Sequence, residues 1–229
     1  MTVFDIHQDV FDEESGERDS DKVEEYIDGL MEEFAASPEA KPLPDSGAGV
    51  GWAATMMEYA LDYLGVTPAE MSRRDFEEVV FHLFPRKVST EPETGLAIIE
   101  ELRAFWRFVQ RQYGLTNAVQ VLASLGPSAG ERLRKELADP SNYGMAKSMF
   151  MLGKQAGFDM TTQEGLDQFM LAYNSQVLAN QGLPAILGPE DEWDDVPAPK
   201  TGPTPREKHE ARREARKRQR KARKRNRRR

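Results

Sequence analysis

Apolar residues recur at helical spacing along most of this chain, and no segment alternates apolar and polar residues with the period of a strand. The longest helical face lies between Pro92 and Gly114; it comprises Leu96, Ile99, Leu102, Phe105, Trp106, Val109 and Tyr113. Glycine, proline or a Ser/Thr N-cap bounds each apolar segment. The pattern predicts an all-α fold, an irregular bundle of about seven short helices.

The chain divides by composition into six parts. We expect a disordered acidic lead at 1–19, an amphipathic helix at 20–36, a Pro/Gly linker at 37–51, a helical domain at 52–181, a Pro-rich acidic linker at 182–205 and a disordered arginine-rich tail at 206–229. Within the helical domain the expected helices cover 52–64, 68–84 or 72–84, 92–113, 117–125, 130–138, 145–157 and 163–178.

The charge of the chain is strongly polarised. Residues 206–229 hold 15 of the 31 Lys and Arg residues and three of the 39 acids, which gives this tail a formal charge of +12. The rest of the chain carries −20, and the two parts give the net charge of −8. A tail of this kind suits a polyanion, whereas the body would repel one.

We therefore predict that the tail contacts nucleic acid or ribonucleoprotein. The tail has no aromatic residue for base stacking, so the predicted binding is to phosphates and nonspecific. The alternatives are a solubilising tail, an acidic protein or a membrane partner and, in a eukaryotic chain, a nuclear localisation signal. The candidate phosphate-binding residues are Arg212, Arg213, Arg216, Lys217, Arg218, Arg220, Lys221, Arg223, Lys224, Arg225, Arg227, Arg228 and Arg229.

Two further segments could contact other groups. The acids of 190–195 precede the tail and could hold its arginines until nucleic acid displaces them, or they could form a plain acidic spacer. The amphipathic helix at 20–36 could instead dock on a partner protein, which is the alternative function, a protein-interaction adaptor. Its candidate contact residues are Tyr26, Ile27, Leu30 and Phe34, and packing of this face within the chain would remove that argument.

A basic patch is a weaker candidate. Arg86 and Lys87 lie between two apolar helices, and Arg103 and Arg107 share one face of the next helix. The four would form one patch if these helices pack as a hairpin, whereas a solvated polar edge is the plain alternative.

No residue pattern identifies a reaction, so we expect a non-enzymatic protein without a cofactor or metal. The chain has no cysteine, and its three histidines, His7, His82 and His209, lie in different parts of the sequence. Neither a complete phosphate-binding loop nor a serine nucleophile motif is present. No apolar run approaches the roughly 20 residues that span a bilayer, and the first residues lack an export signal, so we expect a cytoplasmic protein.

One stretch of the helical domain carries a family resemblance. Residues 83–88, Leu-Phe-Pro-Arg-Lys-Val, followed by 102–108, Leu-Arg-Ala-Phe-Trp-Arg-Phe, resemble a helical region of uncharacterised bacterial proteins, some associated with plasmid-borne open reading frames. The resemblance covers about residues 52–125. It implies a bacterial cytoplasmic helical domain and carries no activity or site residues.

Overall fold

The computed structural model describes residues 4–12, 14–43, 51–179 and 203–227. Over this part of the chain the regular structure is helical, and the one β-contact is an isolated bridge between Phe11 and Arg18. The predicted all-α class is therefore confirmed for these residues.

The elements follow one another along the chain, with short π-helical or 3₁₀ pieces labelled η. They are α1 (Ser20–Ala35), α2 (Trp52–Tyr59), η1 (Ala60–Leu64), α3 (Arg73–Glu78), η2 (Val79–Leu83), α4 (Phe84–Lys87), α5 (Thr94–Tyr113), α6 (Ala118–Ser124), α7 (Ala129–Ala138), η3 (Pro140–Asn142), α8 (Met145–Gln155), α9 (Gln163–Ala179) and α10 (Pro205–Arg227). Two of the expected helices are thus continuous runs that change pitch, because η1 prolongs α2 and η2 links α3 to α4.

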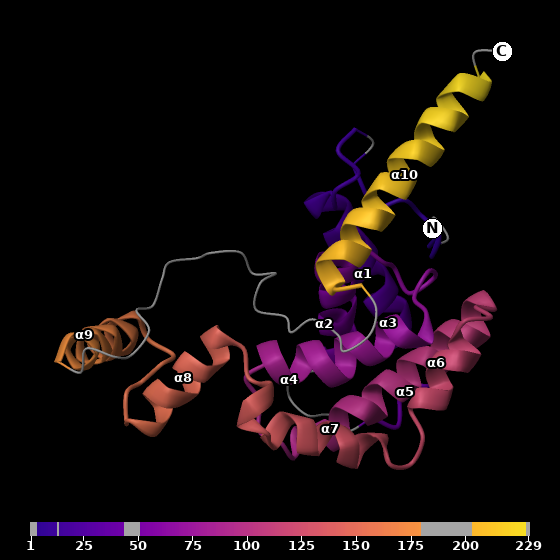
Figure 1. Cartoon of the computed structure of the whole chain (residues 1–229). Coiled ribbons are helices and arrows are strands. Elements are labelled where there is room, and N and C mark those ends of the chain that lie inside the picture. Colours follow the sequence, from indigo (N-terminus) through magenta and orange to yellow (C-terminus); the bar gives the residue numbers. More distant parts are fainter. Residues whose placement is uncertain (1–3, 13, 44–50, 180–202, 228–229) are drawn as a thin grey trace.

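Helix α5 is central to the helical body and packs against α2, α6 and α7 (Figure 1). Its Trp106 is fully buried, and the ring centroids of Phe76 and Phe105 each lie 6.0 Å from it. The contact with α7 depends on Gly95, because a Cβ atom there would lie 2.8 Å from the backbone nitrogen of Arg134. A larger residue would force the two helices apart.

Helix α1 packs on this body and does not present its apolar face to solvent. The four predicted partner-contact residues are all buried: Tyr26, Ile27, Leu30 and Phe34. The Phe34 ring lies 5.4 Å from Phe105 and 5.7 Å from Phe108, measured between centroids. The alternative in which this face is free for a partner protein loses its argument, because the hydrophobic core of the chain itself covers the face.

The acidic lead also differs from the expectation of disorder, at residues 4–12 and 14–19. Ile6, Val10 and Phe11 belong to the core, and the Tyr26 hydroxyl donates to the carbonyl oxygen of Ile6 at 3.0 Å. A tight turn follows, in which one Asp12 carboxylate oxygen accepts the backbone N–H groups of Glu14 and Ser15 at 3.0 and 2.7 Å. We call residues 9–12 and 14–19 the N-terminal hook.

Helices α8 and α9 extend to one side of the body (Figure 1). A buried lysine attaches α8, since Lys147 Nζ donates to the carbonyl oxygen of Pro85 at 2.8 Å and lies 4.1 Å from the centre of the Tyr143 ring. Burial lowers the pKa of Lys147 to about 8. Several large apolar side chains of the two helices remain exposed, among them Leu171, which is 72% exposed.

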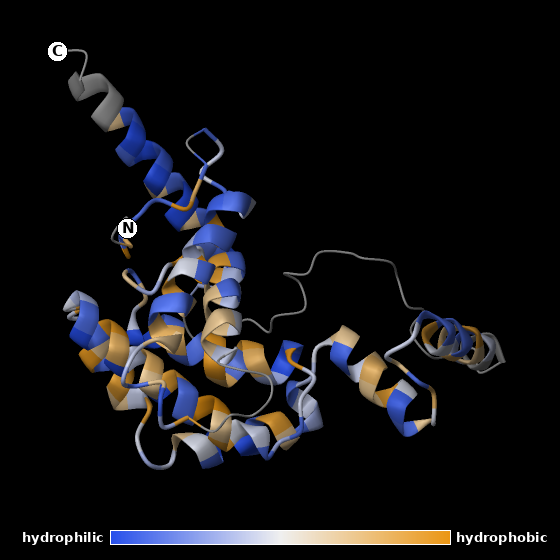
Figure 2. Ribbon diagram, turned by 180° about the vertical axis from the view of Figure 1, so that it is seen from behind, coloured by the Kyte–Doolittle hydropathy of each residue, from blue (hydrophilic) through white to orange (hydrophobic). Residues whose placement is uncertain are grey.

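The basic tail is helical in the part that the structure describes. The helix α10 runs from Pro205 to Arg227, and the part of it that is coloured in Figure 2 is almost uniformly hydrophilic. The helix lies against the body as far as Arg220, and its remaining C-terminal part extends beyond it (Figure 1). Disorder was expected here because like charges repel along a helix, but α10 gains contacts with carboxylates and carbonyl oxygens of the body. Most of the predicted acidic linker, 182–205, and much of the Pro/Gly linker, 37–51, lie outside the described residues.

Candidate nucleic-acid interface

Helix α10 begins with a capping box. The Thr204 hydroxyl accepts the Glu207 backbone N–H at 3.2 Å, while a Glu207 carboxylate oxygen accepts the Thr204 backbone N–H at 2.7 Å. Pro205 occupies the first helical position, where its missing N–H has no cost. These hydrogen bonds lower the pKa of Glu207, with the backbone bond to Thr204 as the largest cause.

Three arginines at four-residue spacing form the face of α10 that contacts the body: Arg212, Arg216 and Arg220. Because residues four apart lie on one side of a helix, a single surface of the body can receive all three guanidinium groups. We call this surface the arginine receptor; it consists of the N-terminal hook, the end of η1 at Leu64 and Gly65, and the carboxylate of Asp75.

Arg212 and Arg216 bind the C-terminal end of the α2–η1 helix. Nη1 of Arg212 donates to the Leu64 carbonyl oxygen and Nη1 of Arg216 to that of Gly65, both at 2.9 Å. The last carbonyl oxygens of a helix lack partners within it and carry the negative end of its dipole. Gly65 closes η1 with φ of 61°, and a Cβ there would lie 3.0 Å from the His209 ring. Glycine thus permits both this turn and the close approach of α10.

Asp75 adds a fixed negative charge to the receptor. Its carboxylate accepts Nη2 of Arg212 at 2.8 Å and caps α3 by accepting the Ser72 backbone N–H at 3.1 Å. Burial alone raises the pKa of Asp75, but the hydrogen bonds from Ser72 and Arg212 outweigh it and hold the pKa below its usual value. The carboxylate is therefore charged where the arginine binds it.

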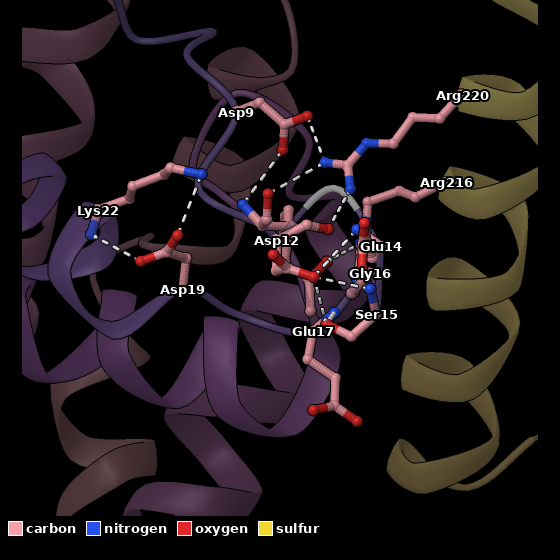
Figure 3. A network of polar contacts seen from close by, with 12 residues as sticks. Asp9, Asp12, Glu14, Ser15, Gly16, Glu17, Asp19, Lys22, Arg216 and Arg220 are labelled. Carbon is pink, nitrogen blue, oxygen red and sulfur yellow. Dashed lines mark hydrogen bonds and ion pairs between the residues drawn. The ribbon is translucent and has the colours of Figure 1, made fainter. Parts of the chain in front are cut away.

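The N-terminal hook receives Arg216 and Arg220 (Figure 3). Nη2 of Arg216 donates to the Gly16 carbonyl oxygen at 3.3 Å, and its guanidinium carbon lies 3.6 Å from the centre of the Phe11 ring. Arg220 donates to the carbonyl oxygens of Phe11 and Asp12 and to the Asp9 carboxylate. Main-chain oxygens thus make up much of the hook's contact with α10.

Two further cations of α10 flank this face. Lys208 pairs with Glu78 in a largely buried contact, and Arg213 binds the Ser15 carbonyl oxygen at 2.9 Å and the Glu17 carboxylate at 2.9 Å. Burial, together with the charges of Arg216 and Arg213, lowers the pKa of His209, whose ring lies beside Gly65. Lys208 and His209 were not among the predicted contact residues.

The predicted phosphate-binding residues therefore fall into two groups. Arg212, Arg213, Arg216 and Arg220 contact the body, and Lys217 is partly covered beside Gly16. Arg218 and Lys221 are exposed, and Arg223, Lys224, Arg225 and Arg227 continue the helix. Arg228 and Arg229 lie outside the described residues, as do the acids of 190–195, for which a contact with the arginines and a plain spacer were both open.

The four residues of the predicted basic patch have different neighbours. Arg86 and Lys87 belong to α4, where the Arg86 carbonyl oxygen accepts the Gly144 N–H at 3.0 Å and Lys87 lies over the Tyr63 ring. Arg103 instead donates to the carbonyl oxygens of Leu125 and Gly126 at the α6–α7 turn, and with Arg107 it lines a shallow groove there. Arg86 and Lys87 thus lie at the end of α4, whereas Arg103 and Arg107 lie beside the α6–α7 turn. That the four residues form one patch stays a prediction.

The receptor residues were missed at the sequence level. The four-residue spacing of the arginines was visible, as were the turn-forming residues Asp12, Ser15 and Gly16. Every residue has a main-chain carbonyl oxygen, so a sequence does not indicate which of them accept hydrogen bonds. The spacing of the arginines and the turn residues therefore could not show that the helix and the turn meet.

Other site types find no support in the described parts of the chain. Over 4–12, 14–43, 51–179 and 203–227 no three His, Cys, Asp or Glu side chains are grouped as metal ligands. Among the described helices none is both long and apolar enough to cross a membrane.

Comparisons of the chain with models of protein families, with characterised proteins and with solved structures find no match. The resemblance of residues 52–125 to uncharacterised bacterial proteins therefore stays a prediction.

Proposed function

We propose that this chain is a non-enzymatic nucleic-acid-binding protein whose contact with phosphates is the C-terminal half of α10. The observation that carries the proposal is the division of the helix. Arg212, Arg216 and Arg220 fix one face of the helix to the body, while residues 217–229 hold nine further Lys and Arg residues and no acid.

The geometry supports binding to the phosphate backbone. A duplex carries about one negative charge per 1.7 Å of its axis, so a cationic helix can neutralise several phosphates and release their counterions. The C-terminal half of α10 extends away from a body of opposite charge (Figure 1), which keeps the acidic surfaces of the body from the bound phosphates. The tail has no aromatic residue, so we propose weak sequence specificity.

An adaptor function has one remaining observation in its favour. The face of α1 is buried, but the extended pair α8 and α9 exposes Met145, Leu152 and Leu171, at 59%, 44% and 72% of their surface. Leu152 also lines an apolar groove with Phe158 and Phe169, and exposed apolar surface of this kind is typical of protein interaction sites. The second candidate is thus a protein partner bound through α8 and α9, with α10 accessory.

Binding at graded salt concentrations tests the nucleic-acid proposal. Replacing Arg218, Lys221, Lys224 and Arg225 by glutamine removes four charges from the C-terminal half of α10. We expect affinity for a 20-base-pair duplex to fall about a hundredfold at low salt, and the slope of log K against log [salt] to become shallower by roughly 3.6, since each of four phosphate contacts contributes about 0.9. Fluorescence anisotropy with labelled duplex DNA and single-stranded RNA measures both quantities.

The matched control removes four charges from exposed positions of the body. Lys41, Arg107, Lys135 and Lys154 are exposed, and their replacement by glutamine changes the net charge equally. We expect this variant to keep the salt slope of the native chain. Equal losses in the two variants would mean that binding follows net charge and not α10, and the proposal would then be wrong.

A further inference from the structure

We infer that the arginine receptor and nucleic acid compete for the first half of α10, so that the body of the protein restrains its own binding helix. This inference rests on the proposed function and names its regulation. Binding then has two stages: phosphates first contact the C-terminal half of α10, and Arg212, Arg216 and Arg220 join the contact only when the helix leaves the receptor.

The receptor offers the arginines the same chemistry as a phosphate chain. It presents oxygen acceptors in a row along α10: the Leu64 and Gly65 carbonyls, then that of Gly16, then those of Phe11 and Asp12. Carboxylates lie beside them, with Asp75 next to Arg212 and Asp9 next to Arg220. Guanidinium groups bind carboxylates and phosphates through the same two-pronged geometry, so both partners can use the same donors.

In the docked position the first half of α10 cannot bind a polyanion. Arg212, Arg216 and Arg220 face the body, and the three acids of the helix, Glu207, Glu210 and Glu214, are exposed. A phosphate chain that approaches this half of the helix therefore meets carboxylates, which repel it. Release from the receptor frees the helix to turn its arginine face toward the nucleic acid.

The contacts are of a kind that can be exchanged. The side chains of Arg212 and Arg213 are 31% and 33% exposed, and Asp9 is 58% exposed, so water and salt weaken each pair. The strength of the docking comes from several such contacts along one helix. Residues 180–202 separate α9 from α10 in the sequence, so undocking need not break any helix of the body.

A charge variant of the receptor and of the neighbouring Glu78 tests the competition without altering α10. Asp9→Asn, Glu17→Gln and Glu78→Gln remove the carboxylates that pair with Arg220, Arg213 and Lys208, and leave the capping residue Asp75 in place. We expect this triple variant to bind the 20-base-pair duplex about tenfold more tightly, as when a docked form of about nine-tenths of the population is released. The salt slope should steepen by roughly 2 to 3 as Arg212, Arg216 and Arg220 reach phosphates.

A second triple variant controls for net charge. Glu24, Glu25 and Glu100 are exposed carboxylates on α1 and α5 without a described ion pair to α10, and all three become glutamine. We expect a small gain in affinity and the native salt slope. The same gain and slope in both triple variants would overturn the inference.

Movement of the helix is a separate readout. Gln8 and Gln219 line the same crevice between the lead and α10, and the chain has no cysteine, so Gln8→Cys and Gln219→Cys place two spin labels cleanly. We expect a short label distance in the full chain alone and a longer one when duplex or RNA is added. If the native chain binds with a steep salt dependence but the distance stays short, the competition is wrong and the proposed function stands. If no nucleic acid binds at any salt concentration, the proposed function itself fails and the competition with it.

Discussion

Replacing Phe34 by alanine is expected to lower the free energy of unfolding by about 3 to 5 kcal/mol, the range for removing a fully buried aromatic side chain. Phe34 is 0% exposed and packs on Phe105 and Phe108 of α5, so its loss leaves a cavity between α1 and the body. A domain of this size is stabilised by about 5 to 15 kcal/mol in total, so the effect is large. Chemical denaturation followed by circular dichroism measures it.

The control for this prediction lies on the opposite face of the same helix. Glu24 is exposed and makes no described ion pair, and Glu24→Ala should change the free energy of unfolding by less than about 0.5 kcal/mol. If Phe34→Ala lowers the free energy of unfolding as little as Glu24→Ala does, then α1 does not pack on the body. Its apolar face would again be available to a partner protein, and the adaptor function would regain its first argument.

Helix α1 shows how far the sequence determines the fold. The spacing of Tyr26, Leu30 and Phe34 predicted a helix with one apolar face, and the structure has that helix from Ser20 to Ala35. An apolar face must be covered, but the spacing alone does not say whether the same chain or a partner covers it. Tertiary packing decides between the two, and here the body covers the face.

The two charged ends show the opposite case. Composition favoured disorder for the lead and the tail, because few apolar residues and many like charges oppose folding. The lead nevertheless buries Ile6, Val10 and Phe11, and its turn brings carbonyl oxygens to Arg216 and Arg220. The lead supplies oxygen acceptors and the tail supplies guanidinium donors. The composition of either segment alone therefore does not predict that the two segments pair.

The basic patch stays a prediction for a related reason. Arg103 and Arg107 share a helix face as the four-residue spacing requires, and both line the groove beside Leu125. Their relation to Arg86 depended on how two helices cross, and crossing geometry is set by packing of the whole body.

A second large effect is expected at Glu101, which the sequence did not single out. Glu101 is a carboxyl group within the core, 5% exposed, and accepts the backbone N–H of Ala53 at 2.8 Å. The residue before α2 is Gly51, which has no side chain to cap the helix, so Glu101 of α5 performs this role from across the core. Glu101→Ala leaves the Ala53 N–H group buried without that acceptor. We expect the free energy of unfolding to fall by about 3 kcal/mol, measured by chemical denaturation at pH 7.

Glu101→Gln separates the hydrogen bond from the charge. The amide oxygen of glutamine can still accept the Ala53 N–H, so we expect this variant to be clearly more stable than Glu101→Ala. Burial raises the pKa of Glu101 above its ordinary value of 4.5, against the opposing effect of hydrogen bonds from Ala53, Gly51 and Trp52.

The sign of the pH dependence follows from this pKa. Between the unfolded and the folded pKa the folded chain holds the proton and the unfolded chain has lost it, so the contribution of Glu101 to stability falls as the pH rises from about 4.5. The difference in unfolding free energy between the native chain and Glu101→Gln should therefore shift against the native chain between pH 4 and pH 7. Two results would show that the carboxyl group of Glu101 is not a buried cap. One is a constant difference in unfolding free energy over this pH range, and the other is a loss of stability in Glu101→Gln as large as in Glu101→Ala. Only a desolvated carboxyl group that accepts the α2 amides couples its own titration to the stability of the start of α2.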